Sequence, residues 1–167
     1  YTFNIEGTGY GPEIKLEGNS KEISDGDNTP RSADHTNYGD VHISSATLTR
    51  TFTIKNTGNQ TLTLTGSPIV SITGLNKHNF SVTTQPSSNS ISADNSLTFV
   101  VEFDPNATGL KVADVNISNN DNDEGTYSFA INGTGINPEI EVHGNGNEIV
   151  DADATPDIKD FTHFGSV

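Results

Sequence analysis

The sequence contains no cysteine, no methionine and no tryptophan. Without cysteine the chain has no disulfide framework, no thiolate nucleophile and no cysteine-based zinc site. Tryptophan is absent and only four tyrosines are present, which weakens the case for a sugar-binding platform of stacked aromatic rings. The fold therefore cannot be stabilised by disulfides or by a cysteine-bound zinc ion, and a cysteine-based catalytic mechanism is excluded.

Basic residues and long apolar runs are also scarce. Eight Lys and Arg face 22 Asp and Glu, so the formal net charge is −14. Such a chain has no general attraction to phosphate backbones or to anionic lipid, so we expect no nucleic-acid partner. The longest apolar runs are a few residues, far short of the ~20 that cross a bilayer. We therefore also expect no membrane insertion by this segment.

Threonine, asparagine and serine supply a third of the chain, with 21, 19 and 16 residues. Threonine suits half-exposed strands, whereas asparagine and serine suit turns. Short segments that alternate apolar and polar residues are separated by turn sequences; these segments are residues 1–5, 48–54, 62–64, 80–82, 97–103, 113–117 and 127–131. No longer window has helical periodicity. The pattern predicts an all-β fold, an antiparallel β-sandwich.

The two ends of the sequence repeat each other. Residues 1–41 align with residues 127–167 at a constant offset of 126 without a gap, and 21 of the 41 pairs are identical. We interpret the chain as a slice of a longer tandem array with a period of 126 residues. Residues 1–9 would be the last strand of a preceding repeat, 10–136 a complete repeat, and 137–167 the start of a following one.

The predicted junctions between repeats are short. Residues 7–12 separate a predicted strand at Tyr1–Glu6 from another at Glu13–Glu17, and residues 133–138 repeat this junction. Each junction has about six residues and ends in proline, which fixes φ, so we expect neighbouring repeats to touch.

Several segments resemble the Hydin-type Ig-like domains, which are related to PapD-like sandwiches. Residues 38–41 and 164–167 resemble their FGxV opening, 52–58 their FxIxNxG strand and turn, 103–109 their FxPxxxG motif, and 133–135 their GxG exit. More narrowly, loops 25–30 and 120–124 resemble bacterial "choice-of-anchor D" repeats. The resemblance implies an Ig-like sandwich that serves as a non-catalytic module of large, secreted or cell-surface bacterial proteins.

The histidines give no sign of catalysis. None of the five lies in a metal-ligand spacing, and the sequence has neither a GxSxG elbow nor a phosphate-binding loop before a helix. His35 and His143 are not repeated between the two aligned copies. We therefore expect no enzyme.

The acidic residues recur between the copies, whereas the bases do not. Five of the eight acids in the first copy recur in the second copy, and one of them is Glu13, which aligns with Glu139. None of the three bases in the first copy recurs in the second. Ca²⁺ binds carboxylate and amide oxygens, and loop 119–124 is rich in both. We hypothesise that calcium ties the 25–34 insertion to the sandwich or to the neighbouring repeat. The candidate ligands are Asp25, Asp27, Asp34, Asn120, Asp121, Asp123, Glu124, Asp151, Asp153 and Asp160. The alternative is that these residues form Asx turns.

Three functions remain open at this point. The first is a structural and adhesive repeat that forms a stalk or fibre segment of an extracellular surface protein, with neighbouring repeats of the same chain as partners. The second is a self-assembling filament or surface-layer subunit, in which strands of one copy complete the sandwich of another. The third is a glycan-binding or accessory module of a secreted hydrolase.

Overall fold

The computed structural model describes residues 1–5, 9–43 and 46–165. It divides into two units, Tyr1–Asn137 and Pro138–Val167. Neither of the two short 3-10 helices in the described residues, η1 (Ser32–Asp34) and η2 (Lys77–Asn79), is long and apolar enough to cross a membrane. Almost all other regular structure is β-strand, so the all-β prediction is confirmed.

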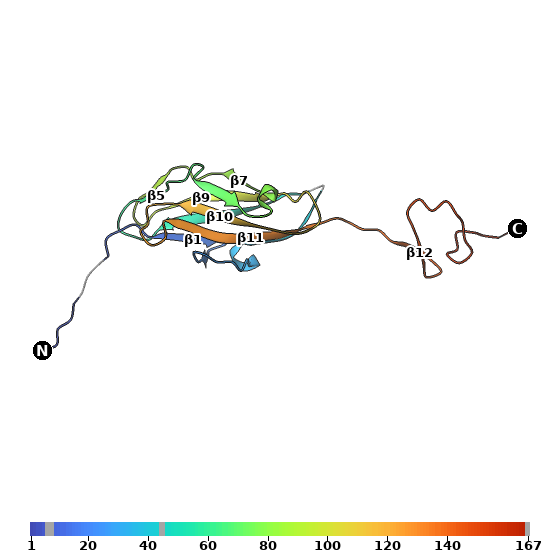
Figure 1. The fold of residues 1–167 in the computed structure, drawn as a ribbon, viewed down its shortest axis with the longest axis horizontal. Coiled ribbons are helices and arrows are strands. Elements are labelled where there is room, and N and C mark those ends of the chain that lie inside the picture. Colours follow the sequence, from blue (N-terminus) through green and yellow to red (C-terminus); the bar gives the residue numbers. More distant parts are fainter. Residues whose placement is uncertain (6–8, 44–45, 166–167) are drawn as a thin grey trace. The chain divides into compact units, whose positions relative to one another are not determined.

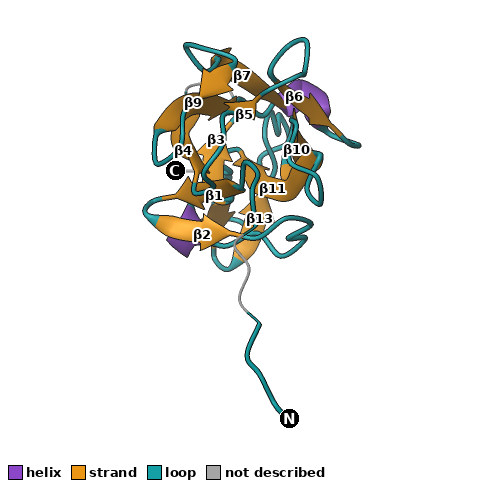
Figure 2. Cartoon of the chain, turned by 90° about the vertical axis from the view of Figure 1, so that its left-hand side faces the viewer, coloured by secondary structure: helices purple, strands orange, loops and turns teal. Residues whose placement is uncertain are grey.

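The first unit is a sandwich of two main sheets. The five-stranded sheet has the order β2-β1-β4-β9-β7, and the four-stranded sheet has the order β3-β11-β10-β6. Figure 2 shows β4 and β9 on one side of the sandwich and β10 and β11 on the other. Strands β5 and β8 form a separate two-stranded sheet.

Eleven strands make up this unit in the described residues. Their bounds are β1 (Ile14–Gly18), β2 (Lys21–Ile23), β3 (Asn37–His42), β4 (Leu48–Asn56), β5 (Leu62–Thr63), β6 (Val70–Thr73), β7 (Phe80–Thr84), β8 (Ser90–Ile91), β9 (Ser96–Phe103), β10 (Gly109–Ser118) and β11 (Thr126–Ile136). Figure 1 traces them in chain order. The six alternating segments between residues 48 and 131 all contain strands, as predicted.

The core lies between the two sheets. Burial alternates along the central strands, as in β11, where every second residue from Tyr127 to Gly135 is buried. Phe52, Phe99 and Phe129 meet there, with Phe52 5.4 Å from Phe99 and 5.5 Å from Phe129 between ring centroids. Full burial of one such ring stabilises the fold by roughly 2–3 kcal/mol. The apolar residues at every second position of the alternating segments are therefore the residues that form this core.

Three details differ from the predictions. Residues 1–5, which were predicted to form a strand together with Glu6, form none, because no described strand pairs with them. Glu6 lies outside the described residues, as do Gly7 and Thr8 of the first predicted junction. Residues 133–136 are not a junction: β11 continues to Ile136 because it pairs with β10 on one side and with β3 on the other. The pairing of β11 with β3 is parallel, whereas the other strand pairings are antiparallel.

Glycine at position 133 follows from this packing. A Cβ atom there would lie 2.5 Å from Cε1 of Phe103, a ring that is fully buried. The strand therefore approaches the ring more closely than any other residue type permits. The first glycine of the GxG sequence is thus explained by the packing of β11 against Phe103 of β9.

The second unit is small and consists of a hairpin followed by a loop. Strands β12 (Val142–Gly144) and β13 (Asn147–Ile149) pair antiparallel. In the repeat alignment they correspond to the β1–β2 hairpin of the first unit. Asn145 in the turn has φ 50°, close to the φ of 51° at Asn19 in the β1–β2 turn.

Candidate metal centre

Four carboxylates of the first unit converge at one end of the sandwich. Glu13 lies immediately before β1, whereas Asp121, Asp123 and Glu124 lie in the loop between β10 and β11. One carboxylate oxygen from each of the four residues can be chosen so that all lie within 4.8 Å of one another. We call these four residues the carboxylate cluster. A group of hard oxygen ligands at such spacing has the chemistry that Ca²⁺ prefers.

Hydrogen bonds fix Asp121 in this cluster. Its side chain is almost fully buried, with 5% of the residue exposed. The Ile14 backbone N–H donates to its Oδ2 atom at 2.9 Å, and its own N–H donates to Oδ1 of Asn119 at 2.7 Å. The bond from Ile14 joins the β10–β11 loop to the start of β1, although the two residues are 107 positions apart in sequence, and the bond to Asn119 lies within the loop.

The two asparagines of this loop are engaged in its structure. Asn119 Nδ2 donates to the Glu124 carbonyl at 2.8 Å and so closes the loop on itself. The Thr63 N–H donates to Oδ1 of Asn120 at 2.7 Å. The predicted ligand Asn120 therefore already uses its side-chain oxygen to hold the loop against β5.

Glu124 has an unusual environment. Its Oε2 atom is buried and has no hydrogen-bond partner. Burial, followed by the negative charges of Glu13 and Asp121, raises the pKa of the Glu124 carboxyl, with smaller contributions from Asp123 and Asp25. Both effects disfavour the charged form. A cation placed among these oxygens would favour the charged form of Glu124, because its positive charge opposes both effects.

The cluster borders a pocket on the surface of the first unit. Glu13, Asp121 and Asp123 line it, together with residues 9–12, 57–59 and 93–94. Several backbone carbonyls of these loops already accept hydrogen bonds, including those of Gly9 and Gly11, which accept from Asn59. The carboxylates of the cluster are therefore the oxygens that the pocket offers to a cation such as Ca²⁺.

Asp25, Asp27 and Asp34 lie elsewhere, in the segment between β2 and β3. Asp25 accepts a hydrogen bond from the Ser128 N–H at 2.7 Å. Its negative charge contributes to the raised pKa of Glu124. Asp25, Asp27 and Asp34 are not part of the carboxylate cluster.

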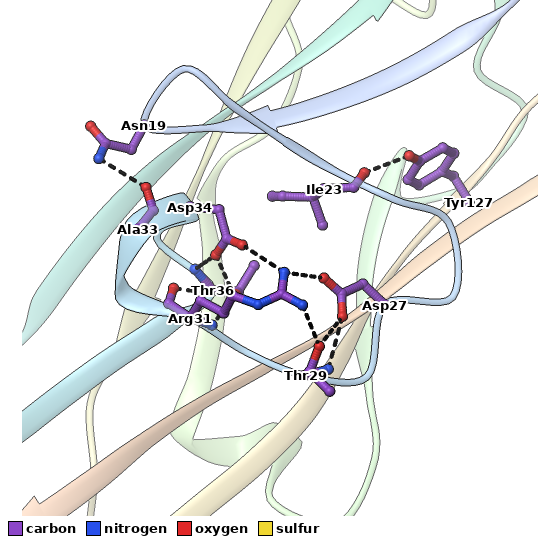
Figure 3. Close-up of polar contacts among 9 residues, drawn as sticks. All are labelled: Asn19, Ile23, Asp27, Thr29, Arg31, Ala33, Asp34, Thr36 and Tyr127. Carbon is purple, nitrogen blue, oxygen red and sulfur yellow. Dashed lines mark hydrogen bonds and ion pairs between the residues drawn. The ribbon is translucent and has the colours of Figure 1, made fainter.

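Asp27 and Asp34 each form a turn with a threonine two residues later (Figure 3). Oδ1 of Asp27 accepts from the N–H and hydroxyl of Thr29 at 2.9 and 2.6 Å, and Oδ1 of Asp34 accepts from the same two groups of Thr36 at 3.0 and 2.6 Å. The bond from the Thr29 hydroxyl is the main cause of a lowered pKa at Asp27. Nη1 of Arg31 lies 3.3 Å from Asp27 Oδ2 and 3.8 Å from Asp34 Oδ2.

The second unit repeats these turns bond for bond. Oδ1 of Asp153 accepts from the N–H and hydroxyl of Thr155 at 2.8 and 2.5 Å, and Oδ1 of Asp160 accepts from those of Thr162 at 3.0 and 2.7 Å. These threonine bonds lower the pKa of both carboxyls. Asp151 is exposed. Turn formation therefore explains why two of the acid pairs recur, and this agrees with the alternative considered for the sequence.

Glycine accompanies the Asp34 turn in both units. A Cβ atom on Gly18 would clash with the Asp34 carbonyl oxygen, and one on Gly144 would clash with that of Asp160. The hairpin and the Asp–Thr loop thus pack against each other at the same point in each unit. Asp34 itself is 3% exposed.

Glu13 is the member of the cluster that the ligand prediction left out. Its recurrence at Glu139 was a usable signal, because it is one of the five shared acids. The spacing of residues along the sequence does not link Glu13 to loop 119–124, because only the tertiary fold brings this segment beside residue 121.

Comparison with known proteins agrees with this fold. Residues 31–134 match a family model described as a HYDIN/CFA65/VesB-like, Ig-like domain. No curated protein matches the sequence.

Solved structures are similar at low sequence identity. A protein of unknown function from Porphyromonas gingivalis is 15% identical with a TM-score of 0.52, over 74% of this chain and 46% of that one, so the chain spans less than half of its length. The secreted serine protease VesC from Vibrio cholerae is 12% identical with a TM-score of 0.49, over 62% and 22%. PapD-like domain 7 of human CEP192 is 12% identical with a TM-score of 0.45, over 83% and 96%.

The family match covers more than half of the chain and includes η1 and the strands from β3 to most of β11. This chain belongs to the family of HYDIN/CFA65/VesB-like, Ig-like domains.

Proposed function

We propose that this chain is part of a non-catalytic structural and adhesive array, in which Ig-like modules follow one another along a large bacterial surface protein. The observation that carries the proposal is the repeat, because residues 138–165 share both sequence and turn hydrogen bonds with residues 12–39. Two segments with the same hairpin and the same Asp–Thr turns are expected when one module type is used in series. The narrower resemblance to "choice-of-anchor D" repeats fits this proposal, as does an extracellular location.

The module is suited to bear load. β11 lies between β10 and β3 and pairs with β10 over ten residue positions, from Thr126 to Gly135. Chain tension on the module would act between β1 near its start and β11 at its end, which belong to different sheets. Separating these strands requires either that β1 leaves β4 or that the two sheets come apart, and both expose buried core residues.

Forced unfolding of single molecules tests this role. We expect one cooperative step that releases residues 14–136, a contour length of roughly 40 nm at ~3.3–3.6 Å per residue. Gradual extension at low force, without such a step, would contradict a load-bearing module. The measurement uses the 167-residue chain held at both termini.

We also propose that Ca²⁺ binds the carboxylate cluster and ties the β10–β11 loop to β1. The buried, unbonded Oε2 atom of Glu124 supports this, because it faces like charges and lacks any donor. The proposed ligands are Glu13, Asp121, Asp123 and Glu124. Asp27, Asp34, Asp153 and Asp160 are left out because their Oδ1 atoms already accept two hydrogen bonds each.

Thermal unfolding tests the calcium proposal. The melting temperature in EDTA should rise when Ca²⁺ is added, by an amount that grows with the concentration of free ion. Magnesium at the same concentration serves as the control, because it demands a stricter octahedral geometry. An unchanged melting temperature in Ca²⁺ would contradict the site.

A further inference from the structure

The further inference concerns Arg50, one of the two arginines of the chain. The other, Arg31, is paired with acids: its Nη1 atom lies 3.3 Å from Asp27 Oδ2 and 3.8 Å from Asp34 Oδ2 (Figure 3). Arg50 has no ion pair with any residue that the structure describes. Its Nε atom is buried and has no hydrogen-bond partner. In a chain with 22 acids and eight bases, a partly buried arginine without a carboxylate beside it is unexpected.

Arg50 lies on the core face of β4. Burial alternates along this strand, and Arg50 shares the face of Phe52 and Ile54, whose side chains are fully buried. It pairs with Val101 of β9, whose carbonyl accepts from the Tyr38 hydroxyl at 3.2 Å. Burial raises the pKa of this hydroxyl, and the positive charge of Arg50 opposes the rise. The guanidinium therefore lies at the margin of the core, near the start of β3.

His35 approaches the same place from η1. It directly follows Asp34, whose carbonyl oxygen packs so closely on Gly18 of β1 that a Cβ atom there would clash. Gly18 in turn pairs with Phe52, which is the next residue after Arg50 on the core face of β4. Strand register and packing therefore bring His35 and Arg50 together from different elements.

The imidazole of His35 responds to Arg50. Burial is the main cause of a lowered pKa at His35, and the positive charge of Arg50 lowers it further, whereas Asp34 raises it. The Nδ1 atom of His35 is buried and has no hydrogen-bond partner. Asp34 is engaged elsewhere, because its Oδ1 atom accepts two bonds from Thr36 and its Oδ2 atom faces Arg31. The place thus combines a positive charge with two buried nitrogens that lack partners.

We propose that Arg50 and His35 bind an oxyanion, with the guanidinium as its charged donor and the imidazole as a second donor. The N–H groups of a guanidinium form a planar fork that matches two oxygens of a carboxylate or of a phosphate. The imidazole donates from Nδ1, so one anion satisfies both buried nitrogens. Both residues are partly exposed, so the anion enters from solvent.

The second unit supplies a matched substitution for His35. The repeat counterpart of His35 is Phe161, which has no hydrogen-bond donor in its side chain. The two residues have nearly the same backbone conformation, with φ 68° at His35 and 65° at Phe161. We therefore expect His35→Phe to fold. It should bind the anion about tenfold more weakly, since it loses one hydrogen bond to a charged group.

NMR spectroscopy of the 167-residue chain tests the site, because two arginines give only two side-chain Nε–H signals. Titration at neutral pH with sodium phosphate, and separately with sodium acetate, should shift the Arg50 signal to a plateau in at least one anion and leave the Arg31 signal in place. A response to phosphate alone indicates a tetrahedral oxyanion as ligand, a response to acetate alone indicates a carboxylate, and a response to both means that either fits. Sodium chloride at equal ionic strength controls for screening.

Arg50→Lys assigns the signal and tests the fork. It keeps the positive charge but lacks the planar set of donors, so anion binding, followed through the backbone N–H signals of residues 35–38, should be lost. The proposal is overturned if the Arg50 signal moves in neither oxyanion, moves equally in chloride, or moves together with that of Arg31. Binding by Arg50→Lys or His35→Phe as tight as that of the natural sequence would overturn the role assigned to that residue.

Discussion

Replacing Glu124 with glutamine separates the electrostatic cost of the carboxylate cluster from its proposed role as a Ca²⁺ site. Glu124→Gln keeps the shape of the side chain but removes the charge whose pKa is raised by burial and by Glu13 and Asp121. In EDTA we expect the variant to be more stable than the natural sequence. In Ca²⁺ we expect it to lose most of the gain in stability that the natural sequence shows.

The size of the effect follows from the distances in the cluster. Two unit charges 4.8 Å apart repel by about 0.9 kcal/mol in water, and physiological salt reduces this to about 0.5 kcal/mol. Three charged neighbours then give a total of about 1.5 kcal/mol. For a domain of this size each kcal/mol shifts Tm by about 2–4 °C, so we expect Glu124→Gln to raise Tm by about 3–6 °C in EDTA.

The sign of the pH dependence is a second measure of the same charge. The pKa of Glu124 is raised in the folded state above its ordinary 4.5, so the folded chain binds the proton more tightly than the unfolded chain. The repulsion is therefore fully present at neutral pH and is relieved as pH falls through the folded-state pKa. In EDTA the difference in Tm between Glu124→Gln and the natural sequence should shrink as pH falls from 7 towards 4.5.

Differential scanning calorimetry of three proteins in EDTA and in Ca²⁺ checks these expectations. The third protein is Glu148→Gln, which removes an exposed carboxylate of the second unit and should behave like the natural sequence under both conditions. If Glu124→Gln melts below the natural sequence in EDTA, the cluster is not repulsive and the reasoning is refuted. If the variant retains the full response to Ca²⁺, Glu124 is not a ligand.

Three further substitutions probe contacts within the first unit, each measured by urea unfolding. Thr36→Val removes the hydroxyl that donates to Asp34 and should cost about 1–3 kcal/mol, because the hydrogen bond to a charged group is lost in a buried turn. Tyr127→Phe removes a buried hydroxyl that donates to a backbone carbonyl and should cost about 1–2 kcal/mol; no loss would mean that water replaces the bond. Gly133→Ala should cost about 1–3 kcal/mol by overpacking, and adding Phe103→Leu should recover part of that loss, because the added Cβ is closest to this ring.

Alternation in the sequence predicts the strands that lie inside the sheets. Strands β4 and β9 are long enough to show a period of two, and each buries one face. Residues 1–5 have the same alternation, yet they form no strand, because a strand needs a hydrogen-bonded neighbour as well as a pattern. The extent of β11 was missed for the opposite reason: its last residues are Gly-rich, but neighbours on both sides keep them in the sheet.

The candidate metal site could be predicted only in part. Asp121, Asp123 and Glu124 are adjacent in sequence, so composition identifies their loop. Glu13 joins them through a contact between segments far apart in the chain, and no local pattern encodes such a contact. Recurrence between the copies marks Glu13 of the carboxylate cluster as well as the turn-forming Asp27 and Asp34, so recurrence alone does not distinguish the two kinds of acid.

The number of hydrogen bonds that each carboxylate accepts separates these two kinds of acid. Oδ1 of Asp34 accepts two bonds from Thr36, so its recurrence with its threonine needs no ligand. Asp25 is different, because it accepts a hydrogen bond from Ser128 on β11 rather than from a neighbour in sequence. Its counterpart Asp151 keeps the carboxylate in a unit that has no strand equivalent to β11 among its described residues. The recurrence of Asp151 agrees with the tandem array that we propose, because in such an array each copy of this aspartate would lie beside the β11-like strand of its own repeat.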